Sequence, residues 1–221
     1  GIRELDKRIT KEAAARYDKL HERLVAEVLR RFTLPEYGLR GAADAIAAGD
    51  GILLDGDHFR RYFQSLDLKT SFPGVLGFGF IEAVPDSALA AYQQRQQRQA
   101  PRFQLRDRSK EALHYIVRHI EPQADNREAW GLDLSANPVA QSALQQALSR
   151  GTSTMSGVIT FQRQGRAYPG YLLLTPVLRQ PAALLDAGQR QAALLGFMYS
   201  PVSLDALMQG IADATEQQLD F

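Results

Sequence analysis

The sequence of 221 residues contains no cysteine. A disulfide framework, a zinc ribbon and a thiol nucleophile are therefore excluded. An excess of charge of one sign is also lacking, because 26 Lys and Arg stand against 25 Asp and Glu, a formal net charge of +1. This balance gives no reason to expect a nucleic acid as partner. No apolar run approaches the ~20 residues of a membrane-spanning helix, and no signal peptide precedes Ile2.

Recognisable catalytic motifs are equally scarce. The sequence has no Walker loop, no GxSxG element, no kinase signature and no HExxH. Among its four histidines, His114 and His119 are five residues apart, which on a strand places the rings on opposite faces and disfavours a shared metal ion. Ser153 and Ser156 follow Gly151 without a neighbouring base, so a turn role is favoured over catalysis. We predict no catalytic residue, no metal site and no cofactor.

The dominant feature that is present is a long helix over residues 2–34, which Pro35 is expected to end. Its apolar side chains recur with a mean spacing of about 3.7 residues, typical of a straight amphipathic helix. Two interpretations remain open: a helix packed along its own domain, and a stalk that pairs with a second copy. The chain opens on Gly1 without a Met, so we expect a piece of a longer protein. The apolar stripe consists of Ile2, Leu5, Ile9, Ala13, Tyr17, Leu20, Leu24 and Val28.

The remaining pattern is that of an α+β fold ending in neighbouring antiparallel strands. A second helix over residues 37–48 closes at Gly49, and Asp57 is placed to cap a short helix that begins at His58. Further helices are expected over residues 89–99 and 138–148, and from Val202 onward. Strands are expected over residues 75–84, 114–120, 156–162, 171–178 and 194–199, with residues 179–191 as a wide hairpin loop.

The segment from Trp130 to Pro138 places a tryptophan, a glycine and an aspartate directly before a helix start. A short carboxylate in that position can accept hydrogen bonds from free backbone amides, so we interpret Asp133 as a turn residue. The alternative, in which Asp133 contributes its charge to a pocket, stays open. Trp130 is equally compatible with a core position and with a platform for a ligand.

Taken in order, several short pieces of the chain resemble the CHASE domain, the extracytoplasmic sensory domain of membrane-bound histidine kinases and nucleotide cyclases. The resemblance covers roughly residues 30–207 and rests on the joint order and spacing of these pieces. They are Tyr37-Gly38-Leu39-Arg40-Gly41, His58 to Phe63, Phe72-Pro73-Gly74-Val75, Ile81-Glu82-Ala83-Val84, Ile120-Glu121-Pro122, Gly131-Leu132-Asp133-Leu134, Ala147 to Gly151, Leu174-Thr175-Pro176-Val177 and Gly196-Phe197-Met198-Tyr199.

The resemblance implies a stalk helix with a following short helix over residues 1–50 and a membrane-distal PAS-like ligand-binding domain over residues 51–203. Residues 204–221 would connect to a truncated membrane-proximal PAS-like domain. In the plant cytokinin receptors of the family, an acidic side chain early in the helix after this Gly-Leu-Asp-Leu segment grips the adenine. The matching position is Ala140 or a neighbour, Val139 or Gln141, and none of these is acidic. We therefore expect a different small molecule.

The leading hypothesis is a periplasmic small-molecule sensor, tethered to the inner membrane in the full-length protein and dimeric through its N-terminal helix. Its output, a histidine kinase or a cyclic-di-GMP enzyme, would lie outside this chain. The alternative is a structural dimerisation module whose pocket is filled by its own side chains; a cytoplasmic hydrolase lacks a nucleophile–base pair. The expected pocket is largely apolar. Its candidate residues are Phe80, Arg118, Trp130, Leu134, Thr160, Leu174, Pro176, Met198 and Tyr199.

Overall fold

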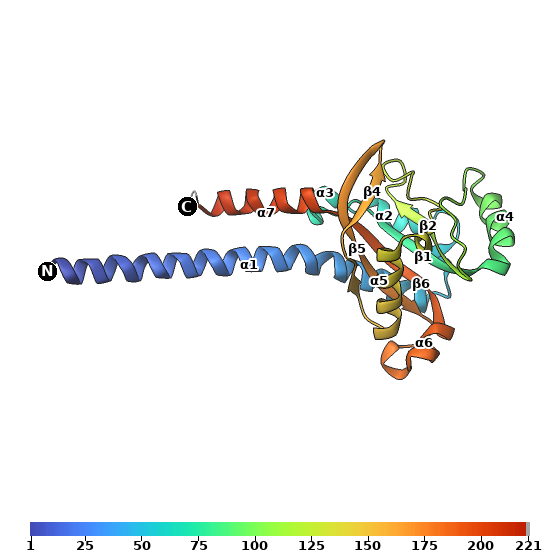
Figure 1. The fold of residues 1–221 in the computed structure, drawn as a ribbon, viewed down its shortest axis with the longest axis horizontal. Coiled ribbons are helices and arrows are strands. Elements are labelled where there is room, and N and C mark those ends of the chain that lie inside the picture. Colours follow the sequence, from blue (N-terminus) through green and yellow to red (C-terminus); the bar gives the residue numbers. More distant parts are fainter. Residues whose placement is uncertain (220–221) are drawn as a thin grey trace.

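The computed structural model describes residues 1–219 and has at its centre a six-stranded antiparallel sheet with helices on both faces (Figure 1). The strand order is β2-β1-β6-β5-β3, and β4 pairs with β5 beside this path. The α+β prediction is thus confirmed. The strands are β1 (Phe78–Pro85), β2 (Leu113–Glu121), β3 (Thr154–Met155), β4 (Ile159–Arg163), β5 (Arg166–Leu178) and β6 (Leu194–Ser203).

Helices make up most of the remaining described chain. Local sequence signals placed several of them correctly: α4 has the predicted bounds, and α5 begins after the Asn137 cap and ends at Gly151 with φ of 67°. The helices are α1 (Ile2–Ala48), α2 (His58–Gln64), α3 (Leu68–Ser71), α4 (Leu89–Gln99), α5 (Pro138–Arg150), α6 (Ala187–Ala193) and α7 (Leu204–Leu219), with 3-10 turns η1 (Ile52–Leu54), η2 (Asp86–Ala88), η3 (Leu134–Ala136) and η4 (Ala182–Leu184).

The prediction that Pro35 ends the first helix is wrong, because α1 continues through it to Ala48. Proline removes one intrahelical hydrogen bond and so disfavours a helix interior. The segment beyond it compensates by packing, since Leu39 and Ile46 are completely buried against the sheet. Burial of side chains of this size stabilises by about 1.5–3 kcal/mol each, comparable to the roughly 3 kcal/mol that proline costs. Tertiary packing therefore decides this junction.

Two other local predictions are corrected. Asp57 occupies the N-cap position of α2, but its side chain makes no capping hydrogen bond and pairs instead with Arg60 at 3.2 Å. The segment expected to be a wide loop, residues 179–191, contains η4 and the start of α6. That helix is stabilised by a capping box between Asp186 and Gln189, a pattern that satisfies free amides at a helix start.

The α1 and α7 helices leave the sheet on the same side, so the start of α1 and the far end of α7 lie far from α4 (Figure 1). Where α7 runs beside α1, the apolar stripe of α1 is half-buried at Leu20 and Leu24. Farther out, Leu5 and Ile9 are more than half exposed, at 57% and 55%. Within residues 1–219, no helix is long and apolar enough to cross a membrane. The predicted second domain concerns chain beyond α7, and residues 220–221 lie outside the described part.

The sheet buries a separate apolar cluster on each face because side chains of a strand alternate between faces. One cluster joins the inner end of α1 to Phe78, Phe80 and Met198. The other lies under α5 and includes Leu174 and Tyr199. This division matters for the site, because neighbouring residues on one strand face different clusters.

Candidate functional site

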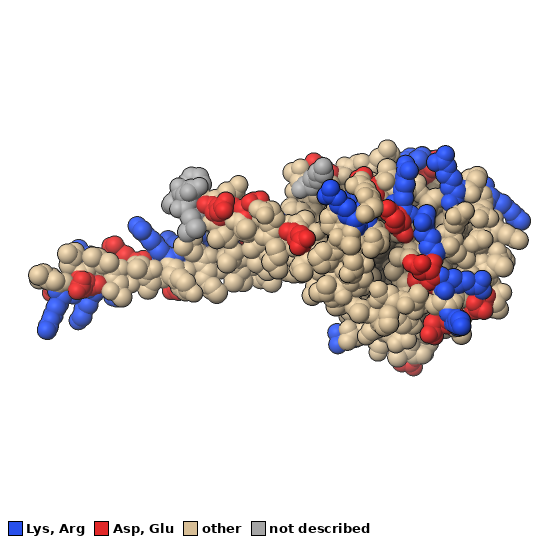
Figure 2. Space-filling model, turned by 45° about the horizontal axis from the view of Figure 1, so that its top comes forward, with Lys and Arg blue, Asp and Glu red and all other residues tan. Residues whose placement is uncertain are grey.

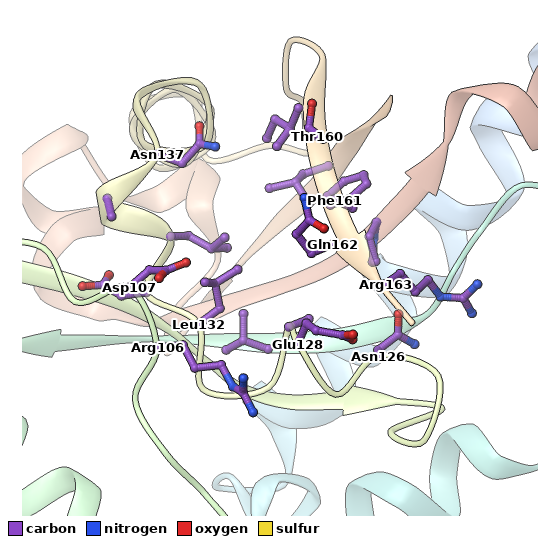
Figure 3. A pocket seen from close by; sticks show the side chains of 18 of the residues that line it. Arg106, Asp107, Asn126, Glu128, Leu132, Asn137, Thr160, Phe161, Gln162 and Arg163 are labelled. Atoms are coloured by element: carbon purple, nitrogen blue, oxygen red, sulfur yellow. The ribbon is translucent and has the colours of Figure 1, made fainter. Parts of the chain in front are cut away.

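A cleft of about 820 Å³ opens on the α5 side of the sheet. Strand β4 forms one wall, and the segment leading from β2 to α5 forms the opposite wall (Figure 3). Its lining includes apolar and polar side chains from both walls. These are, among others, Leu76, Arg106, Asp107, Val117, Asn126, Glu128, Leu132, Leu134, Asn137, Ile159, Thr160, Phe161, Arg163, Leu172 and Tyr199.

The wall opposite β4 is held against β2 by backbone hydrogen bonds. The Gly131 amide donates to the Val117 carbonyl at 2.8 Å, and the Arg106 amide donates to the Gly131 carbonyl at 2.9 Å. Gly131 has φ of 81°, and a Cβ there would lie 1.9 Å from the Gln104 carbonyl oxygen. Only glycine tolerates both conditions. This position therefore fixes how closely the 104–107 loop approaches the wall.

Asp133 anchors the same wall as a buried acceptor, which agrees with its predicted turn role. Its Oδ1 accepts from the Ser135 amide at 3.0 Å, the Ser135 hydroxyl at 2.6 Å and the Tyr115 amide at 3.3 Å. Its Oδ2 accepts from the Ser109 amide at 3.0 Å and lies 2.6 Å from His114 Nδ1. Burial alone would raise the pKa of Asp133, but these hydrogen bonds hold it below its usual value.

A serine, a histidine and an aspartate therefore meet, but not in a catalytic arrangement. Ser109 Oγ lies 3.4 Å from His114 Nδ1, the nitrogen that Asp133 already occupies. The other ring nitrogen, Nε2, lies 2.8 Å from Asp86 Oδ1. A nucleophilic triad needs a ring nitrogen free to take the hydroxyl proton. Both nitrogens of His114 face carboxylates, so neither is free to accept the proton of the Ser109 hydroxyl. The arrangement therefore holds the wall in place and is not a nucleophilic triad.

His119 occupies a different environment on β2. Its Nε2–H donates a hydrogen bond to the Leu54 carbonyl at 2.7 Å, and its ring stacks on Phe59 with a centroid distance of 4.7 Å. Burial lowers its pKa to about 4. Arg118 is the extra residue of a β-bulge between these histidines, so strict alternation is lost. Within the described residues, no cluster of three or more possible ligands is arranged to hold a metal ion.

The floor of the cleft contains Tyr199 of β6. Its ring lies against Gly79 of β1, where an added Cβ would come within 2.3 Å of Tyr199 Cε1. Tyr199 is only 2% exposed, and its hydroxyl has no hydrogen-bond partner within residues 1–219. Burial raises its pKa well above the ordinary value, so the hydroxyl stays protonated. A buried hydroxyl without a partner is uncommon and is suited to a polar group of a bound molecule.

The rim of the cleft has charges of both signs. Arg106 and Asp107 lie on the wall next to β2, whereas Glu128 and Arg163 lie toward the other end (Figure 3). On the face shown in Figure 2, basic and acidic groups are similarly intermixed over the globular part. The rim charges therefore do not strongly favour either an anionic or a cationic ligand.

Two hydrogen bonds connect the tip of the β4–β5 hairpin to the loop before the wall. Gln164 Nε2 donates to Asp125 Oδ1 at 3.0 Å, and the Gly165 amide donates to Glu128 Oε1 at 3.4 Å. Gln164 and Gly165 are exposed, whereas Asp125 and Glu128 are half-buried. This connection closes one end of the cleft without filling its apolar interior.

Helix α5 begins at another edge of the cleft. Asn137 caps it by accepting hydrogen bonds from the Val139 and Ala140 amides at 3.0 and 3.1 Å. Ala140, the central one of the three positions that could match the acidic residue of cytokinin receptors, is completely buried in the α5 cluster and does not line the cleft. The start of the helix thus presents the Asn137 side chain rather than a carboxylate.

The structure brings three of the nine predicted pocket residues to the cleft: Leu134, Thr160 and Tyr199. Phe80 and Met198 lie in the cluster on the opposite face. Leu174 and Pro176 are buried beneath the α5 side without reaching the cleft.

Arg118 and Trp130 also lie outside the cleft lining. Arg118 turns toward η1 and pairs with Glu82 at 3.4 Å and Asp55 at 3.4 Å. Trp130 donates its indole N–H to the Arg118 carbonyl at 3.0 Å and packs edge-on against Phe103. Its emission therefore reports a position behind the wall rather than direct contact with a ligand.

Several cleft residues escaped the sequence analysis, notably Arg106, Asp107, Asn126 and Glu128. They belong to irregular segments without periodicity, so no pattern pointed to them. Phe161 was the exception with a usable signal, because it is an aromatic residue within a predicted strand, next to the candidate Thr160. Its side chain is half-buried against the α5 cluster.

Comparison with known families assigns the chain to a family. The family described as "CHASE domain" matches residues 53–221. Among solved structures, the chain is similar to "Methyl-accepting Chemotaxis protein X", at 12% identity and a TM-score of 0.41, over 96% of this chain and 68% of that one. The search of curated proteins gives no match. Because the family match spans most of the sequence, the chain belongs to the CHASE domain family of extracytoplasmic sensory domains.

Proposed function

We propose that this domain senses a small molecule in the cleft on behalf of a transmembrane signalling receptor. The observation that carries the proposal is the buried hydroxyl of Tyr199, which lacks a partner within the described chain at the floor of an 820 Å³ cleft. A ligand with an apolar body and one polar group would satisfy it. The domain would be periplasmic, and the output a histidine kinase or a cyclic-di-GMP enzyme.

The proposed route of the signal follows the chain from the cleft floor. Strand β6 contains Tyr199 and continues directly into α7, which begins at Leu204. Helix α7 is attached to α1 where Arg31 Nη2 donates to the Gly210 carbonyl at 3.2 Å. A ligand that favours one position of β6 would therefore shift α7 against α1, a change in population of two arrangements.

Replacing Tyr199 with phenylalanine tests the floor of the cleft. We expect Tyr199→Phe to weaken binding of the best compound from a thermal-shift screen by about 3- to 10-fold, since one hydrogen bond contributes about 0.5–1.5 kcal/mol. A bound compound at 100 times its dissociation constant stabilises by about 2.7 kcal/mol. Without ligand, the variant should be as stable as the parent, because the lost hydroxyl has no partner in the described structure.

The matched control is Tyr171→Phe. Tyr171 is also buried, and its hydroxyl also lacks a partner among residues 1–219, but it lies in the α1-side cluster next to Phe32. This variant should keep the affinity of the parent. Equal affinity of Tyr199→Phe and Tyr171→Phe would remove Tyr199 from the proposed site.

The structural dimerisation module remains the second candidate, favoured by the exposed apolar side chains of α1. Leu5 and Ile9 are 57% and 55% exposed, whereas Leu20 and Leu24 are half-buried beside α7. We therefore place the proposed contact with a second copy on the outer part of α1. Dimerisation and ligand sensing are compatible, and the two tests are independent.

Substituting Leu5 and Ile9 together with glutamate is expected to lower self-association of the isolated domain by at least about tenfold, corresponding to ~1.4 kcal/mol. Sedimentation equilibrium over a range of protein concentrations would measure the effect. Ala15→Glu with Ala26→Glu is the control, since it adds the same charge on another face of the helix. Equal association of the two double variants would exclude this interface.

A further inference from the structure

His114 is held between two carboxylates that come from different parts of the chain. Its side chain is 0% exposed, with Asp133 Oδ2 2.6 Å from Nδ1 and Asp86 Oδ1 2.8 Å from Nε2. Arg108 also approaches Asp86, at 3.4 Å. Of the charged groups on the elements around the ring, Asp133, Asp86 and Arg108 are those that face this cluster. The two carboxylates outnumber the one guanidinium.

This geometry requires a protonated ring for both hydrogen bonds. A neutral imidazole has one N–H donor and one lone pair, so one of the two carboxylates would then face a lone pair. Burial alone lowers the pKa of His114, but the bonds to Asp133 and Asp86 outweigh it and raise the pKa above the ordinary value. The ring therefore changes charge on the alkaline side of about pH 6.5.

The hydrogen bond to Asp86 is the one that deprotonation breaks. Asp133 accepts four further hydrogen bonds, from the amides of Ser109, Tyr115 and Ser135 and the Ser135 hydroxyl, so its position and charge are fixed. Within residues 1–219, the Asp86 carboxylate contacts only Arg108 besides His114, and the side chain is 51% exposed; the Asp86 backbone amide donates separately to the Ala112 carbonyl at 2.8 Å. The remaining proton of a neutral ring consequently stays on Nδ1 toward Asp133, and Nε2 loses its donor.

Asp86 begins the segment that supports the distal end of the cleft wall. It opens η2, which leads into α4. Gln97 of α4 donates to the Phe103 carbonyl at 2.9 Å, and Gln93 accepts from the Leu105 amide at 3.4 Å. The chain continues from Leu105 directly to Arg106 at the rim of the cleft. A change at Asp86 thus reaches both α4 and the loop beside the cleft. Helix α4 lies far from the start of α1 (Figure 1).

We propose that His114 is a proton-responsive switch, a second input of this domain that does not require the small-molecule ligand. With its proton, His114 fixes Asp86 and the start of α4 against β2. After loss of the proton from Nε2 to solvent, the Asp86 side chain is released, the hydrogen bond from the Asp86 amide to the Ala112 carbonyl alone holds the start of η2, and the η2–α4 segment opens more often. The stability that His114 contributes is present below pH 6.5 and is lost as the pH rises through its raised pKa.

The test follows His114 and the η2–α4 segment in the 221-residue chain between pH 6 and pH 9. Proton NMR of the imidazole ring gives the midpoint of His114, and amide hydrogen exchange, expressed as protection factors, reports opening of residues 86–92. We expect a midpoint above 6.5 and protection that falls by about tenfold or more across the same transition, a change of ~1.4 kcal/mol in opening. His119 does not change its charge between pH 6 and pH 9, because its pKa is about 4.

Asp86→Asn is the decisive variant, because it removes one charge at a half-exposed position and should fold normally. Because asparagine keeps an acceptor oxygen but no charge, we expect protection at pH 6 to be lower than in the parent and to change less with pH, with the His114 midpoint moved downward. His114→Gln should resemble the deprotonated parent at every pH. Asp44→Asn, at an exposed position of α1, should behave as the parent. A parental midpoint at or below 6.5, or a parental pH response in Asp86→Asn, would overturn the proposal.

Discussion

Replacing Asp133 with alanine is expected to lower the free energy of unfolding by about 3–5 kcal/mol, the range for breaking a buried ion pair by removing one partner. The substitution leaves the His114 ring without its closer carboxylate. It also leaves the amides of Ser109 and Ser135 without their side-chain acceptor. Urea denaturation at pH 6, where His114 is protonated, would measure the loss.

Two further variants test whether the loss of stability is specific to Asp133 and its charge. Asp133→Asn keeps one acceptor oxygen for the neighbouring amides but removes the charge that faces His114. We therefore expect it to lower the free energy of unfolding less than Asp133→Ala does. Asp44→Ala removes an exposed carboxylate of α1 and should change stability by no more than about 0.5 kcal/mol. If Asp133→Ala kept parental stability and instead lost its response to ligand, Asp133 would belong to the binding site.

Substituting Leu132 with tryptophan is expected to abolish ligand binding, reducing affinity more than about 100-fold, or ~2.7 kcal/mol. The Leu132 side chain extends from the wall opposite β4 into the cleft (Figure 3), and the residue is half-buried. Its backbone is fixed by the hydrogen bond from the Val117 amide to the Leu132 carbonyl at 2.9 Å. A larger side chain there therefore occupies the cleft instead of displacing the wall.

A matched control comes from a second cavity of about 830 Å³, which shares Leu76 and Arg163 with the cleft but is also lined by Phe63, Phe72 and Phe78. Phe72→Trp adds an indole to that cavity and should leave affinity unchanged. Titration of the best screening compound, followed by calorimetry, would compare the two variants after thermal unfolding has shown that both fold. Loss of binding in Phe72→Trp alone would move the site to the second cavity.

Elements with strong local signals were predictable from the sequence. The α5 helix has an asparagine cap followed by proline at its start and a glycine at its end, and each acts within one turn of the backbone. The family assignment also followed from the order of short segments, and the match over residues 53–221 confirms it. These features depend on neighbours in the chain, which a sequence displays directly.

The cleft could be predicted only in part, because its residues come together from segments that are distant in the sequence. Tyr199 and Met198 are adjacent, yet one lies in the cleft floor and the other in the α1-side cluster. Which of the two alternating sets of β6 side chains faces the cleft depends on the pairing of β6 with β1 and β5. A register shift of one residue would exchange the two sets. The rim residues Arg106 and Glu128 come from loops whose positions depend on distant hydrogen bonds.

What the sequence alone determined is the helix–strand order, the α5 caps and the family, whereas it left both a turn role and a pocket role open for Asp133. The tertiary structure decided the continuation of α1 through Pro35, the faces of the strand residues and the double carboxylate contact of His114. The physical reason is the range of the interactions involved. Caps and periodicity act over a few residues, whereas Asp86 reaches His114 from 28 residues away, and Leu39 offsets a proline only because the sheet buries it.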